Sequence, residues 1–141
     1  MVLEVKNIVY YYKTNKSKNV LNGISYKFEE GKVYAILGAS GSGKTTFLSL
    51  LAGLDVPVLG TILYEEEDIL KGGLNHHRKE HVSLVFQNYN LIDYLTPKEN
   101  VMLGGNGNPE ELLTAVGIQK EDWDRKVLQL SGGQQQRVAI A

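Results

Sequence analysis

The sequence contains no cysteine, no long apolar run and no strong excess of charge of one sign. The lack of cysteine excludes disulfide bonds and thiolate metal sites within the chain, and it suits a reducing compartment such as the cytoplasm. No apolar run approaches the roughly eighteen residues that a membrane span needs, and Met1 to Lys6 lack the apolar core of a secretory signal. A net charge of −1 gives no electrostatic reason to expect a nucleic acid partner. The 141 residues, 43% hydrophobic and 22% charged, fit one soluble domain or part of a larger one.

A glycine-rich motif organises the chain. It has the form G-x-x-x-x-G-K-[ST] and consists of Gly38, Ala39, Ser40, Gly41, Ser42, Gly43, Lys44 and Thr45. An apolar, β-prone run at 32–37 precedes it, and a segment with helical apolar spacing at 46–52 follows it and ends at Gly53. Strand, loop and helix in this order are the context that a phosphate-binding loop requires, so a chance glycine-rich turn is the weaker interpretation.

The loop predicts a nucleoside triphosphate site. Its glycines allow successive backbone N–H groups to point at a polyphosphate, and the following helix N-terminus adds a partial positive charge. We expect Lys44 to reach the β- and γ-phosphates and Thr45 to give its hydroxyl to Mg²⁺. We also expect Thr46 to be one of the residues that bind the nucleotide.

A second motif near the end of the chain narrows the class of nucleotide enzyme. After Leu130 come Ser131, Gly132, Gly133 and Gln134. The serine hydroxyl and two glycine N–H groups read as a second anion site at the start of a helix, which we expect from Gln134 onward. This Leu-Ser-Gly-Gly-Gln run resembles the signature motif of ABC-type ATPases. An ordinary helix start is the alternative, and the order of the two motifs disfavours it.

The resemblance implies a fold and a division of the chain. It implies an α/β P-loop NTPase with a RecA-like core, a mainly parallel sheet, an antiparallel β lobe and an α-helical insert. Residues 1–87 would form the β lobe and the first part of the core, 88–130 the helical subdomain, and 131–141 the signature motif and the start of its helix. The apolar run 82–86 would be a strand of the core sheet.

The resemblance also assigns two further site residues. ABC-type domains carry an aromatic residue upstream of the phosphate loop that stacks on adenine, and Tyr12 stands at that place, with Tyr11 as the alternative. Gln87 follows the expected strand 82–86 and corresponds to the glutamine of the family's Q-loop. That residue binds Mg²⁺ and positions the attacking water. A packed strand tyrosine and an exposed loop glutamine are the plain structural alternatives.

Local signals predict the remaining elements. Strands are expected over 5–12, 20–21, 24–28 and 60–64. Thr96, Pro97 and Glu99 have the pattern of an N-cap, a first helical position and a capping box, for a helix that Gly104 stops. A second helix is expected from Pro109 to Val116, ended by Gly117. The acidic run 65–68 is interpreted as a solvated turn rather than a metal site.

Two formal motif matches are rejected. His77, Glu80 and His81 match the H-x-x-E-H spacing of inverted zinc peptidases, but they lie in a short basic stretch before an apolar run, without a third ligand. Asn15, Lys16 and Ser17 form a glycosylation sequon that a cytosolic protein would not use.

The sequence ends at Ala141, inside the expected signature helix, with no cap, glycine or charge to stop it. Relatives in the resembled family continue to an apolar strand, the Walker B strand, that ends in Asp-Glu; the Asp organises Mg²⁺ and the Glu polarises the attacking water. The sequence therefore predicts an N-terminal piece, truncated before the Walker B strand. Alone it would bind nucleotide, show negligible turnover and expose apolar surface.

The function that the resemblance implies is the ATP-hydrolysing subunit of an ABC transporter. Two subunits would pair head to tail around two Mg·ATP, with each phosphate loop facing the partner's Ser131–Gln134, and would drive a transmembrane permease from the inner face of the membrane. The compact helical insert, together with 88–92 and 99–101, is similar to the lipoprotein, macrolide and bacteriocin exporter group. An ABC-type ATPase without a transport role and a hydrolytically inactive nucleotide-binding fragment remain the alternatives.

Overall fold

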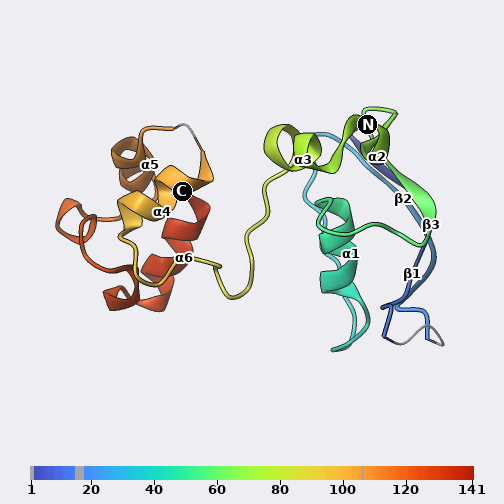
Figure 1. The fold of residues 1–141 in the computed structure, drawn as a ribbon, viewed down its shortest axis with the longest axis horizontal. Coiled ribbons are helices and arrows are strands. Elements are labelled where there is room, and N and C mark those ends of the chain that lie inside the picture. The colour runs from blue at the N-terminus through green and yellow to red at the C-terminus, as the bar shows by residue number, and fades with distance from the viewer. Residues whose placement is uncertain (1, 15–17, 106) are drawn as a thin grey trace. The chain divides into compact units, whose positions relative to one another are not determined.

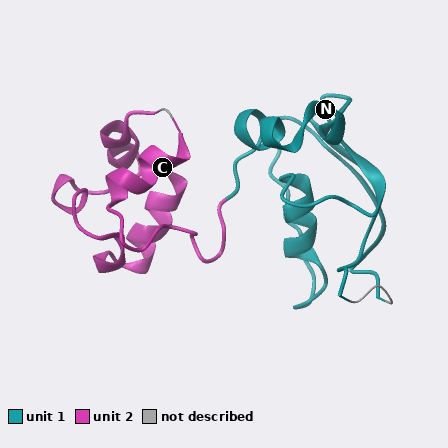
Figure 2. Cartoon of the chain, in the orientation of Figure 1, with its two compact units in different colours: residues 1–84 teal, residues 85–141 magenta. Residues whose placement is uncertain are grey.

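The chain folds into two compact units (Figures 1 and 2). The computed structural model describes residues 2–14, 18–105 and 107–141. The first unit spans Met1–Leu84 and holds the sheet, and the second spans Val85–Ala141 and is helical. The division predicted at 87/88 and 130/131 stays a prediction, and the sequon at Asn15 lies outside the described residues.

The first unit is built on a four-stranded sheet with the order β2-β1-β3-β4. The strands are β1 (Leu3–Tyr10), β2 (Leu21–Phe28), β3 (Leu59–Tyr64) and β4 (Glu67–Asp68). All three pairings are antiparallel, with Val5 of β1 opposite Tyr26 on one side and Ile62 on the other. This sheet is the expected antiparallel β lobe.

A bulge interrupts β1 where it passes β3. The register of both β1 pairings shifts next to Asn7, whose φ is +50°. Gly60 faces this bulge with a φ of +92°, and a Cβ there would lie 2.4 Å from the Lys6 carbonyl oxygen. Only glycine fits so close to another backbone, so Gly60 permits the bulge that turns the end of β1.

Helix α1 (Lys44–Leu51) packs on the sheet and forms the core of the first unit. Its side chains Phe47, Leu50 and Leu51 join buried residues of the strands, including Val5, Ile8, Leu21 and Ile62. Gly53 follows the helix with a φ of +67°, the left-handed conformation that ends many helices, as the sequence predicts. The helix that follows the glycine-rich loop is therefore fixed to the β lobe.

The strands predicted at 32–37 and 82–86 are not formed. Both segments run without a ladder partner among the described residues, and Val33 is 100% exposed and Leu37 88%. A strand exists only when a neighbour supplies its hydrogen bonds, and apolar patterning alone cannot provide that neighbour. The mainly parallel sheet is thus absent from the described residues, whose strand pairings are all antiparallel.

The acidic run after β3 forms a turn that continues into a short strand. Glu65 and Glu66 have φ values of +47° and +72° and reverse the chain, whereas Glu67 and Asp68 form β4 instead of extending the turn. The Asp68 side chain then accepts a hydrogen bond from the Leu70 N–H and caps α2 (Ile69–Gly72). Helix α3 (Leu74–His76) and a π-helical turn at His77–His81 follow.

The second unit contains α4 (Pro97–Gly104), α5 (Pro109–Ala115) and α6 (Gly132–Ile140). Short 3₁₀ turns at Lys120–Asp122 and Val127–Gln129 join α5 to α6. The capping box predicted for α4 is confirmed: Thr96 accepts from the Glu99 N–H, and the Glu99 carboxylate accepts from the Thr96 N–H. The pKa of the Glu99 carboxyl is lowered, chiefly by the hydrogen bond from the Thr96 backbone and to a smaller extent by hydrogen bonding with the Thr96 side chain.

One apolar cluster holds the second unit together. Its buried members are Val101, Leu113, Ile118, Trp123, Val127, Leu130 and Val138. They come from all three helices, from the 3₁₀ turn Val127–Gln129 and from the segments beside the turns, so α6 is packed into the same core as the helical insert. Gly117 has a φ of +73° after α5, in agreement with the predicted stop.

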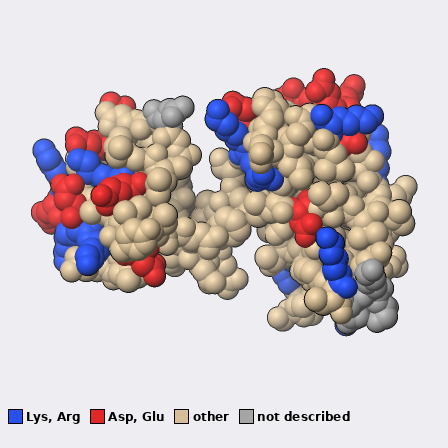
Figure 3. All heavy atoms as spheres, viewed as in Figure 1, with Lys and Arg blue, Asp and Glu red and all other residues tan. Residues whose placement is uncertain are grey.

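The surface carries charges of both signs. Basic and acidic side chains are interspersed on the face of each unit that Figure 3 shows, in keeping with the net charge of −1. Within the described residues, no helix combines the length and the apolar character that crossing a bilayer requires.

Candidate functional site

The glycine-rich loop lies directly before α1 in the first unit. Gly41 and Gly43 have φ values of +76° and +89°, which turn the loop into the helix. A Cβ at Gly43 would lie 3.0 Å from the carbonyl oxygen of Val20 and 3.0 Å from the Leu21 side chain. Gly43 is therefore required both by its backbone conformation and by the closeness of the neighbouring chain. The loop thus presents the N-terminus of α1, as a phosphate-binding loop should.

The ammonium group of Lys44 lies over this loop. Its Nζ donates to the carbonyl oxygens of Gly38 at 2.9 Å and Ala39 at 2.8 Å, and it lies 3.5 Å from the Ser42 hydroxyl. The fixed positive charge and the helix N-terminus both favour an anion at the same place. Thr45 is exposed in the first turn of α1, and its hydroxyl is a hard oxygen donor of the kind that Mg²⁺ takes.

Tyr12 is attached to the helix that carries the loop. Its hydroxyl lies 2.7 Å from Thr46 Oγ1, and its ring meets the Tyr10 ring edge to face, with centroids 5.3 Å apart. Tyr12 is 49% exposed, whereas Tyr11 is partly buried. The structure therefore brings Tyr12 and Thr46 together with an aromatic face open to solvent. Which tyrosine stacks on adenine stays a prediction.

Tyr10, whose ring contacts the ring of Tyr12, is itself held by a hydrogen bond. Its hydroxyl donates a hydrogen bond to the Asp55 carboxylate, and its ring is buried in the core. The bond to Asp55 and the burial of the hydroxyl raise the pKa of Tyr10 to about 12. Asp55 lies in the chain that leaves α1, so this bond ties the end of β1 to the region behind that helix. The sequence offered no signal for the Tyr10–Asp55 pair, because the two residues are 45 positions apart.

The signature motif lies in the second unit, at the start of α6. Ser131 is the N-cap: its hydroxyl oxygen accepts from the Gln134 N–H, and its own N–H donates to Gln134 Oε1. The helix begins at Gly132, two residues before the predicted start at Gln134, because this capping box already fixes the first turn. The N–H groups of Gly132 and Gly133 thus belong to the first turn of a nine-residue helix.

Gln87 also lies in the second unit, in a turn after the unpaired segment 82–86. Its side chain is exposed, and the backbone just after it is unusual, since Tyr89 and Asn90 have φ values of +58° and +52°. The amide oxygen of Gln87 is a further donor of the kind that Mg²⁺ accepts. Its role as a metal and water ligand stays a prediction.

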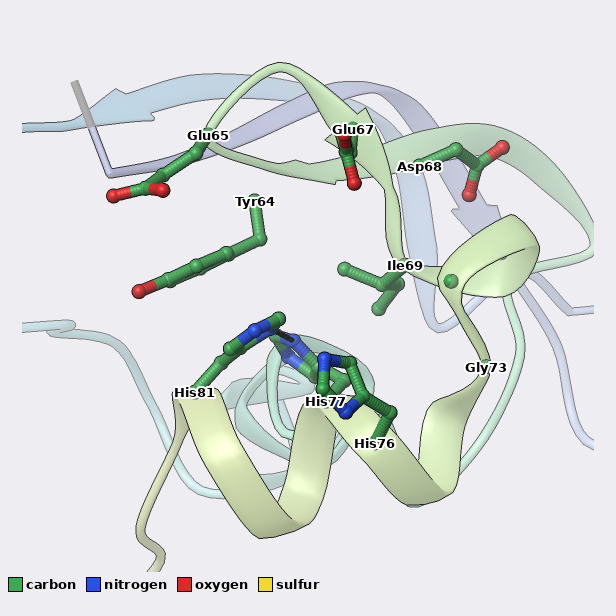
Figure 4. A pocket seen from close by; sticks show the side chains of 10 residues that line it. Tyr64, Glu65, Glu67, Asp68, Ile69, Gly73, His76, His77 and His81 are labelled. Carbon is green, nitrogen blue, oxygen red and sulfur yellow. Dashed lines mark hydrogen bonds between the residues drawn. The ribbon is translucent and has the colours of Figure 1, made fainter.

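The H-x-x-E-H segment forms the π-helical turn His77–His81, and its two histidines lie together beside a pocket of the first unit, with their Nδ1 atoms 3.4 Å apart (Figure 4). The pocket has a volume of ≈ 230 Å³, and Tyr64, Asp68, His76, His77 and His81 lie around it. His77 is buried, and its Nε2 donates to the Leu51 carbonyl oxygen at 2.9 Å, while the His81 ring stacks on Tyr64 at 4.0 Å. Both rings are therefore committed to packing within the unit.

The comparison with known families bears on both motifs at once. A family model described as ABC transporter matches residues 21–141, which include the phosphate loop and the signature. The chain belongs to the ABC transporter family. The structure agrees, because the chain is similar to the dimeric structure of MJ0796, a bacterial ABC transporter cassette, with a TM-score of 0.85 and 32% identity over 98% of this chain and 67% of that one. The fold is thus that of an ABC P-loop ATPase cassette.

Curated members of the ABC transporter family are also similar in sequence. The chain is 45% identical to the uncharacterized ABC transporter ATP-binding protein YclH of Bacillus subtilis, over 99% of this chain and 66% of YclH. It is 38% identical to the lipoprotein-releasing system ATP-binding protein LolD of Syntrophotalea carbinolica, over 99% of this chain and 67% of LolD. The chain therefore spans about two thirds of the length of these relatives.

Proposed function

We propose that this chain is the ATP-binding front part of an ATP-hydrolysing ABC transporter subunit. The observation that carries the proposal is the phosphate loop on α1, where Lys44 and the helix N-terminus offer positive charge at one place. Tyr12, held on Thr46 of the same helix, supplies an aromatic face for the base. A triphosphate joined to a purine is the ligand that matches both features.

ATP and Mg²⁺ are the proposed cofactors. The similarity to a post-hydrolysis state of the MJ0796 cassette bound to ADP and Pi supports an adenine nucleotide. Thr45 and Gln87 offer oxygen donors, which is the chemistry that Mg²⁺ requires, and Mg²⁺ would neutralise charge on the phosphates when bound. Within this chain, Lys44 and the loop N–H groups bind and orient the phosphates.

We further propose a head-to-tail dimer in which the Ser131 hydroxyl and the Gly132 and Gly133 N–H groups face the γ-phosphate on the partner subunit. The dimeric state of MJ0796 supports this arrangement. A γ-phosphate between two helix N-termini would draw the subunits together, and its loss on hydrolysis would release them. This closing and opening would drive conformational changes in a transmembrane permease. The subunit would be bound to that permease at the inner face of the membrane.

The exporter subtype rests on the compact helical insert. The chain is similar both to a relative named for sulfate/thiosulfate import and to one named for bacitracin export. The names of the relatives therefore do not determine the direction of transport. A transport assay with the cognate permease in vesicles decides the direction. Accumulation of substrate outside the cytoplasmic face supports the exporter subtype, and accumulation on the cytoplasmic face contradicts it.

Nucleotide binding is tested by titrating ATP against the 141-residue chain and against its Lys44→Met variant, with Lys71→Met as the matched control. Lys71 is an exposed lysine of α2, outside the loop. The wild type and Lys71→Met should bind ATP, and Lys44→Met should bind it at least tenfold more weakly, because one charge-assisted contact is lost. We also expect no turnover from the 141-residue chain. Equal affinity in all three proteins would contradict the proposal.

A further inference from the structure

The side chain of Gln134 is engaged within its own subunit. Its Oε1 accepts a hydrogen bond from the Ser131 N–H at 2.9 Å, and its Nε2 donates to Asp122 Oδ2 at 2.8 Å. Each heteroatom of the amide therefore makes a hydrogen bond within the subunit, which fixes the orientation of the side chain.

Asp122 is well placed to fix that amide. It ends the 3₁₀ turn Lys120–Asp122, its side chain is only 10% exposed, and its other oxygen accepts from Arg125 at 2.8 Å. The next residue, Trp123, is buried in the core, and its indole N–H donates to the Ile118 carbonyl oxygen at 3.0 Å. A carboxylate anchored in this way, with a donor on each oxygen, holds its partners in one geometry.

The Asp122–Gln134 bond determines how Ser131 is presented. The Ser131 hydroxyl oxygen accepts a hydrogen bond from the Gln134 N–H at 3.3 Å. Among the described residues, the hydroxyl hydrogen has no acceptor, so it can be donated to an external one. If the amide of Gln134 turned away, the Ser131 N–H would lose its acceptor and the capping turn would open. The hydroxyl and the N–H groups of Gly132 and Gly133 would then no longer converge.

We propose that Asp122 is a positioning residue for the signature turn: its carboxylate holds Gln134, and Gln134 holds Ser131, Gly132 and Gly133 in the geometry that receives the partner's γ-phosphate. This inference rests on the proposed function, since it assumes that the turn meets a nucleotide on a second subunit. It assigns Gln134 to the architecture of the turn, whereas the sequence alone grouped Gln134 with the residues that contact the nucleotide.

A charge-swap series separates this role from a general structural one. The test uses the full-length protein that contains these residues, here called the complete cassette. Asp122→Ala removes the acceptor, and Gln134→Glu keeps the acceptor for the Ser131 N–H but sets a carboxylate against Asp122. The double variant, Asp122→Asn with Gln134→Glu, restores one hydrogen bond with donor and acceptor exchanged. Fluorescence of Trp123, the single tryptophan of these 141 residues, measured on the 141-residue chain, reports whether the core beside Asp122 is intact.

Two readouts are needed, both on the complete cassette. The first is hydrogen exchange of the amides of 131–137 without nucleotide, and the second is ATP-dependent association of two subunits, measured by light scattering. Asp122→Ala and Gln134→Glu should each speed exchange and weaken association by about tenfold, whereas the double variant should recover both. ATP affinity of the separate subunit should stay within about twofold in every variant, because the phosphate loop lies in the other unit.

The outcomes are distinct. Unchanged exchange in Asp122→Ala, or changed exchange with unchanged association, overturns the positioning role. Failure of the double variant to recover association also overturns it. If the wild type binds ATP but never associates, the proposed head-to-tail function fails, and that result is visible before any variant is compared.

Discussion

The hydroxyl of Tyr12 and Oγ1 of Thr46 lie 2.7 Å apart, which joins the end of the β lobe to the first turns of α1. Thr46 directly follows the two loop residues expected to meet the phosphates and Mg²⁺. The aromatic ring and the phosphate loop are therefore attached to the same helix, and we expect a nucleotide with its phosphates on the loop to have its base near Tyr12. The edge contact of Tyr12 with Tyr10 restricts the ring further.

Substitution of Tyr12 should separate stacking from the hydrogen bond. Tyr12→Ala should weaken ATP binding about tenfold, because a base–aromatic contact is worth about 1–3 kcal/mol. Tyr12→Phe keeps the ring and loses only the bond to Thr46, so its affinity should fall by less. Tyr11→Ala is the matched control. A larger loss for Tyr11→Ala than for Tyr12→Ala, measured by calorimetric titration, would assign the stacking role to Tyr11.

Gly43 should tolerate no side chain. Gly43→Ala places a Cβ 3.0 Å from the Val20 carbonyl oxygen at a φ of +89°, so the loop must shift away from the conformation that aims its N–H groups. We expect loss of ATP binding and a destabilisation of about 1–3 kcal/mol. Gly72→Ala is the control, since nothing lies within 4 Å of a Cβ there. Equal ATP affinity and equal stability of the two variants would show that the loop can accommodate a side chain at Gly43, which would contradict this prediction.

The Tyr10–Asp55 bond should make stability depend on alkaline pH. The pKa of Tyr10 is raised to about 12 in the folded protein, whereas an unfolded tyrosine ionises near its ordinary value of about 10. The contribution of the bond is complete below pH 10 and is lost as the pH rises to 12, because the unfolded state gives up its proton first.

Unfolding of the wild-type complete cassette and its Tyr10→Phe variant by urea provides the measurement. The difference in free energy of unfolding should shrink by about 1 kcal/mol between pH 8 and pH 11. Tyr34→Phe serves as the control for the other tyrosines, which titrate in both proteins. A difference that stays constant over this range would contradict the raised pKa of Tyr10.

Local features were predictable from the sequence because their causes are local. The capping box at Thr96 and Glu99 and the glycine stops at Gly53 and Gly117 depend on residues within one turn, and the structure contains all of them. The strands expected at 32–37 and 82–86 depend on partners elsewhere in the chain, so apolar patterning predicted their character but not their pairing. Several of their apolar side chains are exposed as a result, Val33, Leu37 and Val85 among them.

The candidate site shows the same division. The residue types and spacing of the phosphate loop and the signature motif were sufficient to predict two anion sites. The contacts that fix the surrounding residues, Tyr10 with Asp55 and Gln134 with Asp122, were not predictable, since they link residues 45 and 12 positions apart. An aspartate near a buried tryptophan gives no sequence signal of its own, because acidic residues in short turns are common and mostly exposed.

The most direct test of the account mixes two inactive subunits. The complete cassette with Lys44→Met lacks the phosphate-loop charge, and the cassette with Ser131→Ala lacks the signature hydroxyl; each alone should show little ATP turnover. If the two motifs act across a head-to-tail dimer, a mixed dimer contains one intact site, so an equal mixture should recover up to about a quarter of wild-type turnover. Turnover in the mixture no higher than in the separate variants would show that the motifs do not meet across the interface, and would contradict the account.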